Sequence, residues 1–137
     1  MKESKRMTLS VLLVDDNPHF LRILDRFLGI HGAGMVQVVG TVVAGREAVA
    51  EAARLRPDVV LVDLTMPEVP GLTLLPQLRR TLADAILIAL SLRDPAEYGD
   101  AAVAAGADAF VSKTRLECDL LPAIQRLAAR EPRRGKA

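Results

Sequence analysis

VVLVDLTMP, residues 59–67, is the stretch of sequence that decides the fold. It begins with four β-branched or aliphatic residues, Val59 to Val62, and the run ends at the carboxylate of Asp63. A short apolar run of this kind is typical of a strand buried on both faces. Such strands belong to parallel sheets with helices above and below, and these sheets bind ligands outside the carboxyl ends of their strands. Asp63 lies at that end and is therefore the first candidate functional residue, although many acids after a strand only face solvent.

Apolar runs and helical patterns alternate along the rest of the chain. Four further strands are predicted, at Leu9–Val14, Met35–Val39, Ala85–Leu90 and Ala109–Ser112. Helices are predicted at 18–28, 44–55, 72–82, 95–105 and 118–129, and the first has Asn17 as its cap and Phe20 on its apolar face. This pattern predicts an α/β fold with a doubly wound, five-stranded parallel sheet of (βα)5 type. We expect flavodoxin-like strand order 2-1-3-4-5.

Composition limits the possible classes of protein. The chain has 137 residues, 50% of them hydrophobic, which is enough to bury one core without disulfides. A net charge of +1 indicates neither nucleic acid nor a membrane surface as a partner. The single cysteine, Cys118, cannot form an internal disulfide, and no apolar run approaches the length that crosses a bilayer. We expect a cytoplasmic domain at 9–129, an N-terminal extension at 1–8 and a basic tail at 130–137.

Polar residues follow four of the five predicted strands. Asp15 and Asp16 follow the first strand, Asp63 ends the third, Ser91 follows the fourth and Lys113 follows the fifth. The second strand, which the expected order puts at one side of the sheet, is followed by no charged residue. Independent solvation of strand ends does not predict this division. We therefore expect one site near the switch point between the first and third strands.

The residue types indicate the chemistry of that site. Three carboxylates in one pocket repel each other unless a cation lies among them. Oxygen ligands without nearby His or Cys suit Mg²⁺ better than Ca²⁺ when the carboxylates are few. Lys113 offers a point charge and Ser91 offers one hydrogen bond to an incoming oxygen. A carboxylate beside Mg²⁺ and Lys can attack phosphorus and become an aspartyl phosphate, and Asp63, alone on the central strand, is the expected nucleophile.

Four features in order carry a resemblance to a known family: LLVDDNP at 12–18, PDVVLVDLTMPEVPGL at 57–72, the strand-end Ser91, and GADAFVSK at 106–113. Together they resemble the receiver domain of bacterial two-component response regulators, over essentially all of residues 9–129. The resemblance implies transfer of a phosphoryl group to Asp63 from a phosphohistidine on a sensor histidine kinase or a histidine phosphotransfer protein. It also implies a stand-alone switch that signals through a downstream protein. On this basis we expect no enzyme, apart from Mg²⁺-dependent self-phosphorylation and slow autodephosphorylation.

The same resemblance implies roles for the acidic residues. Mg²⁺ would be held by Asp16, Asp63 and the backbone carbonyl of Thr65, with Asp15 acting largely through water. Phosphorylation would reshape the surface around the last two helices and the last strand. A phosphorylation-dependent homodimer is compatible with this role.

The resemblance also assigns the residues around the phosphoryl group. Ser91 and Lys113 would hold its oxygens, and Phe110 matches a switch aromatic that turns inward when the hydroxyl moves toward the phosphate. Thr114 stands where the family often has a proline after a cis bond, so we expect a trans bond. Arg93, two positions past Ser91, is placed to shield the phosphate, and we expect Arg93→Glu to speed hydrolysis.

Other functions stay open. The main alternative is a receiver fragment of a DNA-binding transcriptional regulator whose helix-turn-helix domain is absent, since only residues 130–137 follow the last predicted helix. A haloacid-dehalogenase-type phosphatase would carry its acids as D-x-D, whereas Asp15 and Asp16 are adjacent. A flavin carrier would need a Ser, Thr or Gly loop there, and DDNPHF would repel its phosphate. A receiver that has lost phosphorylation is disfavoured by the intact acid, hydroxyl and lysine. His19 and His31 lack metal-ligand spacing and are expected at the surface.

Overall fold

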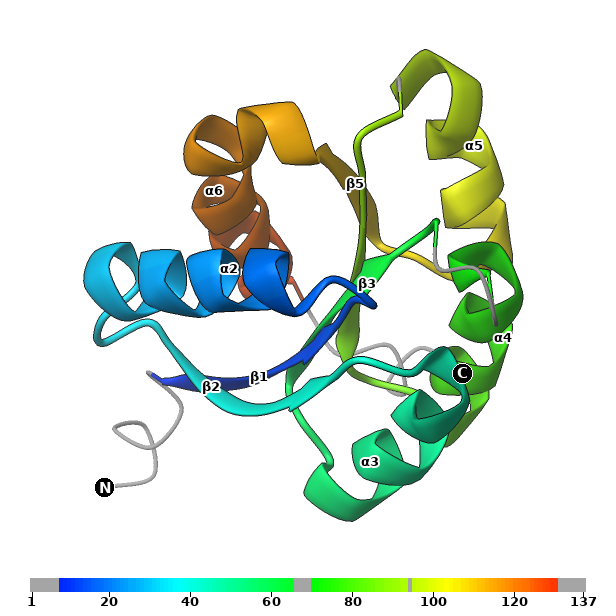
Figure 1. Ribbon diagram of the computed structural model, residues 1–137, viewed down its shortest axis with the longest axis horizontal. Helices are drawn as coiled ribbons and strands as arrows, with labels where there is room; N and C mark the ends of the chain where they lie inside the picture. Colours follow the sequence, from blue (N-terminus) through cyan, green and yellow to red (C-terminus); the bar gives the residue numbers. More distant parts are fainter. Residues whose placement is uncertain (1–7, 66–69, 94, 131–137) are drawn as a thin grey trace.

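The computed structural model of the chain describes residues 8–65, 70–93 and 95–130 (Figure 1). The strands are β1 (Leu9–Val14), β2 (Val36–Val42), β3 (Val59–Asp63), β4 (Ile86–Ser91) and β5 (Ala109–Ser112). The helices are α2 (Pro18–His31), α3 (Ala48–Leu55), α4 (Gly71–Thr81), α5 (Pro95–Ala105) and α6 (Leu116–Ala128), with short 3-10 turns η1 (Gly45–Glu47) and η2 (Lys113–Arg115). Within these described ranges, every helix is too short or too polar to span a bilayer.

The strands form one parallel sheet in the order β2-β1-β3-β4-β5. This order confirms the predicted fold class and topology. Because every pair is parallel, the carboxyl ends of all strands lie along one side of the sheet, here called the carboxyl edge, and their amino ends lie along the amino edge. The central strand, β3, is buried along its whole length, as its apolar sequence predicted.

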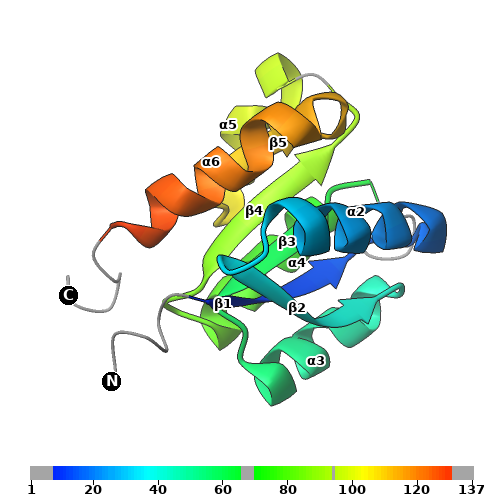
Figure 2. The same cartoon turned by 90° about the vertical axis from the view of Figure 1, so that its left-hand side faces the viewer.

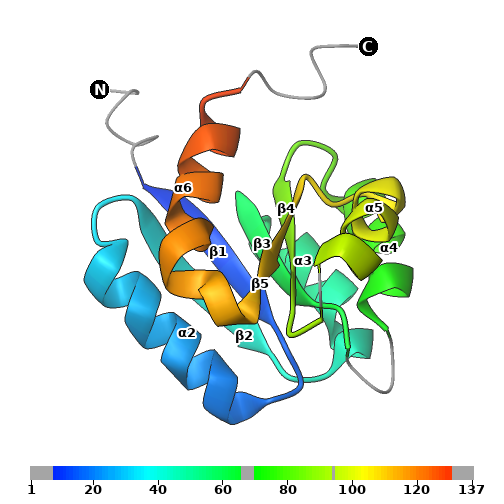
Figure 3. The ribbon, with the colours of Figure 1, turned by 90° about the horizontal axis from the view of Figure 1, so that it is seen from above.

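Helices cover both faces of the sheet. Figure 3 shows α2 and α6 on one side and α3, α4 and α5 on the other, and Figure 2 shows α2 and α6 from their own side. Successive strand side chains point to opposite faces. Leu12 and Val14 of β1 therefore pack with α3, α4 and α5, whereas Val11 and Leu13 pack with α2 and α6. This is why the central strands contain unbroken apolar runs, at 11–14, 59–62 and 86–90.

One strand differs from its prediction. Met35–Val39 was predicted, whereas β2 runs from Val36 to Val42. The register with β1 shifts because Val38 pairs with Val11 but Gly40 pairs with Leu12, which leaves Val39 as an extra residue. This bulge lets the strand continue through Gly40 instead of ending there.

The predicted helices are present, with shifted ends. The 44–55 prediction divides into η1 and α3, while α4 and α6 begin earlier than predicted, at Gly71 and Leu116. The side chain of Asn17 caps α2, accepting hydrogen bonds from the backbone N–H groups of His19 at 3.0 Å and Phe20 at 3.2 Å. The bond between Lys113 and Thr114 is trans, as expected, and no described peptide bond is cis.

A buried ion network lies at the amino edge, just before β5. The side chain of Asp108 is fully buried and accepts hydrogen bonds from Arg79 at 2.8 Å, Arg130 at 3.2 Å and the backbone N–H of Leu87 at 2.9 Å. Arg79 also donates to the carbonyl oxygens of Ala85 and Gly106, at 2.7 and 2.9 Å. The network therefore joins α4, the start of β4, the start of β5 and the end of α6.

Gly71 lies against the backbone at the end of β3, and its replacement tests the packing of α4 on β3. A Cβ atom at Gly71 would lie 2.5 Å from the carbonyl oxygen of Asp63 and 2.6 Å from the Cα of Leu64. Both neighbours are backbone atoms, so Gly71→Ala should lower the free energy of unfolding by about 1–3 kcal/mol in urea titrations. Gly29→Ala is the matched control, because nothing lies within 4 Å of its Cβ position in α2. That change should raise the free energy by up to about 1 kcal/mol. Equal effects of the two changes would contradict the close approach.

Candidate functional site

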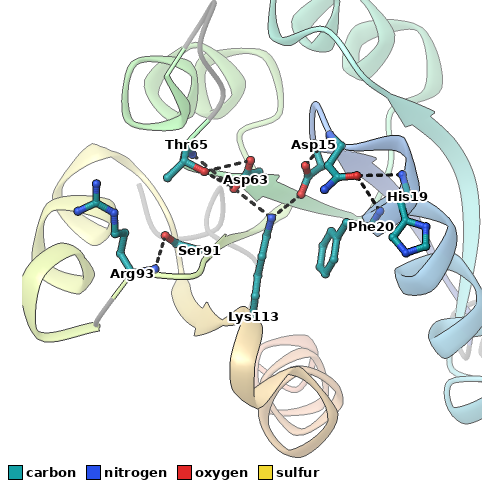
Figure 4. Close-up of polar contacts among 9 residues, drawn as sticks. Asp15, His19, Phe20, Asp63, Thr65, Ser91, Arg93 and Lys113 are labelled. Carbon is teal, nitrogen blue, oxygen red and sulfur yellow. Dashed lines mark hydrogen bonds and ion pairs between the residues drawn. The ribbon is translucent and has the colours of Figure 1, made fainter.

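Four strands bring the predicted site residues to the carboxyl edge. Asp15 follows β1, Asp63 is the last residue of β3, Ser91 is the last residue of β4, and Lys113 directly follows β5. Figure 4 shows the side chains of Asp15, Asp63 and Lys113 pointing toward one another from these separate elements, with Ser91 beside them. Residues far apart in sequence therefore meet because β1, β3, β4 and β5 are neighbours in the sheet.

The acidic residues form a compact group. Asp15, Asp16 and Asp63 each have a carboxylate oxygen within 4.8 Å of the others. Asp15 and Asp63 are both 2% exposed, whereas Asp16 is exposed. Buried carboxylates need a compensating charge or hydrogen bonds. Oxygen donors at this spacing, without His or Cys among them, fit a hard divalent cation.

Lys113 supplies the positive charge between the two buried acids. Its Nζ lies 2.8 Å from Asp15 Oδ2 and 3.4 Å from Asp63 Oδ1, and its side chain is 10% exposed (Figure 4). The shorter contact is a charge-assisted hydrogen bond, which is stronger than one between neutral groups. One ammonium group thus contacts the acids that end two neighbouring strands.

Burial raises the pKa of the Asp15 carboxyl above its ordinary value. Hydrogen bonds from Lys113 and from the backbone N–H of Asn17 lower the pKa, and the charge of Asp63 raises it, but burial is the largest cause. The ionised form of Asp15 is therefore held at a cost to the folded state. A further cation at the acidic group would reduce that cost.

Thr65 contacts Asp63 through groups that sequence reasoning did not consider. Its hydroxyl lies 3.2 Å from Oδ1 and 3.4 Å from Oδ2 of Asp63, and its backbone N–H donates to Oδ1 at 3.4 Å. A hydroxyl two positions after an acid is the sequence signal for such a local turn. The expected part of the Thr65 carbonyl in metal binding stays a prediction.

Ser91 ends β4, the neighbour of β3, and Arg93 follows two residues later. Ser91 is fully buried, and its Oγ accepts a hydrogen bond from the backbone N–H of Arg93 at 2.9 Å. The guanidinium of Arg93 donates to the Tyr98 hydroxyl at 3.3 Å and lies 5.4 Å from the centre of that ring. Figure 4 shows Arg93 pointing away from Asp63. Arg93 is thus held toward Tyr98 in the free protein, and its expected shielding of a phosphate stays a prediction.

Phe110, the predicted switch aromatic, is partly buried on β5. It packs against the cluster that β1, β3, α3, α4 and α5 form on their face of the sheet. The two histidines lie elsewhere: His19 and His31 are both exposed, as expected. Among the described residues, the acidic group at the carboxyl edge is the cluster with metal-ligand spacing, and neither histidine belongs to it.

Comparisons with known proteins agree on one family. The family profile of the response regulator receiver domain matches residues 11–125. The chain is 30% identical over 127 residues to response regulator protein VraR of Staphylococcus aureus, which covers 91% of this chain and 59% of that protein. It is 37% identical over 108 residues to a protein-glutamate methylesterase/protein-glutamine glutaminase of Alkalilimnicola ehrlichii, covering 78% of this chain and 27% of that protein. The response regulator domain of Thermotoga maritima CheB superposes with a TM-score of 0.80 at 26% identity, over 91% of this chain and 99% of that one.

These matches correct one expectation. The expectation that the protein is no enzyme is wrong, because a relative that matches most of this chain is named as a methylesterase and glutaminase. The matched segment spans 27% of that relative and 59% of VraR, so the chain covers less than two thirds of either protein. The residues at the carboxyl edge carry no information on a separate catalytic domain. The site therefore could not predict whether the protein is an enzyme.

The raised pKa of Asp15 predicts a pH-dependent difference between the wild type and Asp15→Asn. The folded state holds the Asp15 proton more tightly than the unfolded chain, so the stabilising contribution of Asp15 is lost as pH rises through the folded-state pKa. In urea titrations without divalent cations, wild type should lose stability relative to Asp15→Asn between about pH 4 and neutrality. Asp25→Asn, at an exposed position on α2, is the control for the loss of one carboxylate from the chain. If wild type instead gains stability relative to Asp15→Asn as pH rises, ion pairing of Asp15 outweighs the cost of its burial.

Proposed function

This chain belongs to the response regulator receiver domain family, and we propose that Asp63 is its phosphoacceptor, with a phosphohistidine as the donor. The observation that supports this proposal best is the position of Lys113, within 3.4 Å of Asp63 and 2.8 Å of Asp15. A nucleophilic carboxylate needs a fixed cation nearby, because the phosphoryl group that approaches it is itself negative. The family match then supports a histidine kinase or a histidine phosphotransfer protein as donor, and with it a cytoplasmic location.

The acidic group fits Mg²⁺ as the required cofactor. Asp15, Asp16 and Asp63 would hold the ion, together with the Thr65 carbonyl, and Asp15 would act largely through water. Bound there, Mg²⁺ neutralises charge on the phosphoryl oxygens and on the acids themselves. Asp16 is the exposed member of the group, so an ion can approach from its side.

The proposed phosphoryl transfer involves the side chains of Asp63, Lys113 and Ser91. A carboxylate oxygen of Asp63 attacks phosphorus, the P–N bond to the donor imidazole breaks, and the imidazole leaves with its bonding electron pair and takes up a proton. The Lys113 ammonium then pairs with a phosphoryl oxygen where it pairs with Asp63 in the free protein. The Ser91 hydroxyl, whose oxygen accepts a hydrogen bond from the Arg93 N–H at 2.9 Å in the free protein, then donates a hydrogen bond to another phosphoryl oxygen.

Movement of Ser91 would link the phosphate to a surface. β4, which ends at Ser91, pairs with β5, and Ala89 lies opposite Phe110 in that pairing. Phe110 is partly buried, so a turn inward would bury more of its ring against α5. We propose that phosphorylation favours this inward state and changes the surface of α5, β5 and α6 for a downstream protein or a second copy of the chain.

The chain matches only part of each relative's length, which favours a second candidate function. In this candidate, residues 9–129 act as the receiver domain of a longer response regulator. VraR and the A. ehrlichii protein both extend well beyond the matched segment. A DNA-binding or an enzymatic output domain would each be compatible with the same phosphorylation site. The length of the protein produced from its native gene, measured by intact mass, separates this candidate from the stand-alone receiver.

Phosphorylation should occur with small donors in the presence of Mg²⁺. Acetyl phosphate, or phosphoramidate with its P–N bond, should add one phosphoryl group by intact mass measurement, and chelation of Mg²⁺ should abolish the reaction. Asp63→Asn should remove the adduct, whereas the exposed-site control Asp25→Asn should retain it. Lys113→Met should slow the reaction by about 100-fold or more, since a charge aimed at the reacting oxygen is lost. An adduct that persists in Asp63→Asn would refute the assignment, and the same samples on a sizing column test for a phosphorylation-dependent homodimer.

Mg²⁺ should stabilise the folded protein through the acidic group. An ion that binds the folded state alone adds about 2.7 kcal/mol when its concentration is about 100 times its dissociation constant. The melting temperature should therefore rise with Mg²⁺ in wild type and in Asp25→Asn, and much less in Asp16→Asn. Asp16 is exposed, so its replacement leaves the buried packing intact. Equal shifts in all three proteins would show that the ion binds elsewhere.

A further inference from the structure

A ring of contacts at the carboxyl edge includes an aromatic residue that the proposed chemistry leaves without a role. We infer that Phe20 is a positioning residue, whose ring face holds the Lys113 ammonium in place between Asp15 and Asp63. The inference rests on the proposed function of Asp63 for its kinetic consequence, but the contact itself does not.

The geometry around the ammonium supports this role. Lys113 Nζ lies 4.2 Å from the centre of the Phe20 ring, well inside the limit of about 6 Å for a cation–π contact. An ammonium has three N–H donors. Asp15 and Asp63 account for the contacts at 2.8 and 3.4 Å, and the ring covers a further side of a group that is 10% exposed (Figure 4).

Hydrogen bonds that begin at Asp15 also fix the backbone of Phe20. Asp15 Oδ1 accepts a hydrogen bond from the backbone N–H of Asn17 at 2.9 Å, and the Asn17 side chain accepts one from the backbone N–H of Phe20 at 3.2 Å. Lys113, over the Phe20 ring, returns to the other oxygen of Asp15 at 2.8 Å. Backbone and side-chain contacts thus close a loop that begins and ends at one carboxylate.

Such a ring partner suits a lysine whose other partners change during the reaction. Phosphorylation would convert the Asp63 carboxylate to an acyl phosphate, and a metal ion would draw on the charge of Asp15. The ring has no polar proton to donate to the phosphoryl oxygens, and its face can attract the ammonium whether or not Asp63 is phosphorylated.

Packing alone is the competing explanation, and Phe27 provides its control. Phe20 and Phe27 are both partly buried on α2 and pack against the same hydrophobic cluster. The cation–π contact of Lys113 is with Phe20. Phe20→Leu and Phe27→Leu therefore remove similar apolar area, while the first also removes a ring over a cation. Phe20→Tyr keeps the ring face.

The direct test is the reactivity of Lys113 toward a limiting amine-acylating reagent, measured by peptide mass spectrometry. The chain has lysines at positions 2, 5 and 136, which serve as internal references for reagent dose. Phe20→Leu should raise the acylation rate of Lys113 by about threefold or more, whereas Phe20→Tyr and Phe27→Leu should stay close to wild type. Urea titration of each variant checks that it folds. A Lys113 rate that is the same in Phe20→Leu and Phe27→Leu would overturn the inference.

The kinetic test uses acetyl phosphate and Mg²⁺. Phe20→Leu should lower the phosphorylation rate constant at saturating donor by about three- to tenfold, with little change in the half-saturating concentration, and Phe20→Tyr should restore the rate. A normal rate in Phe20→Leu, or an equal loss in Phe27→Leu, overturns the positioning role. If wild type itself takes no phosphoryl group, the proposed function fails, and the acylation contrast alone then decides whether the ring holds Lys113.

Discussion

The contact between Lys113 and two buried acids is the constraint on which the site depends. Asp15 and Asp63 are each 2% exposed, and the Lys113 ammonium lies 2.8 and 3.4 Å from them. Carboxylates at this depth destabilise a fold unless positive charge reaches them, and here that charge comes from the far end of the chain. β1 lies between β2 and β3, and β4 separates β3 from β5. The lysine must therefore extend from the end of β5 past β4 to reach both acids.

Much of this fold could be predicted, because polar residues mark the ends of its apolar strands. The predicted bounds of β1 and β5 match the structure residue for residue, since Asp15 follows one apolar run and Lys113 the other. The β2 prediction failed at its end. A glycine inside a strand is read as a stop, whereas the extra residue at Val39 lets pairing with β1 resume at Gly40. Pairing of this kind depends on the neighbouring strand and leaves no local signal.

The site, like the fold, could be predicted only in part from the sequence. Which acids meet follows from strand order, so the sequence alone is enough to group Asp15, Asp16 and Asp63. The direction of a side chain does not follow from strand order. Phe20 belongs to an apolar helical face by its spacing, but its ring also lies against Lys113. The side chain of Arg93 likewise points toward α5, where its guanidinium donates to the Tyr98 hydroxyl.

The two edges of the sheet differ in how their charges are matched. At the amino edge, the guanidiniums of Arg79 and Arg130 face Asp108, and the charge of Asp84 also acts on Arg79. At the carboxyl edge, the ammonium of Lys113 contacts Asp15 and Asp63, and the exposed Asp16 completes the group of three acids. Arginines of the fold itself thus compensate Asp108, whereas the acidic group carries more negative charge than Lys113 offsets, and this excess attracts cations from the surrounding solution.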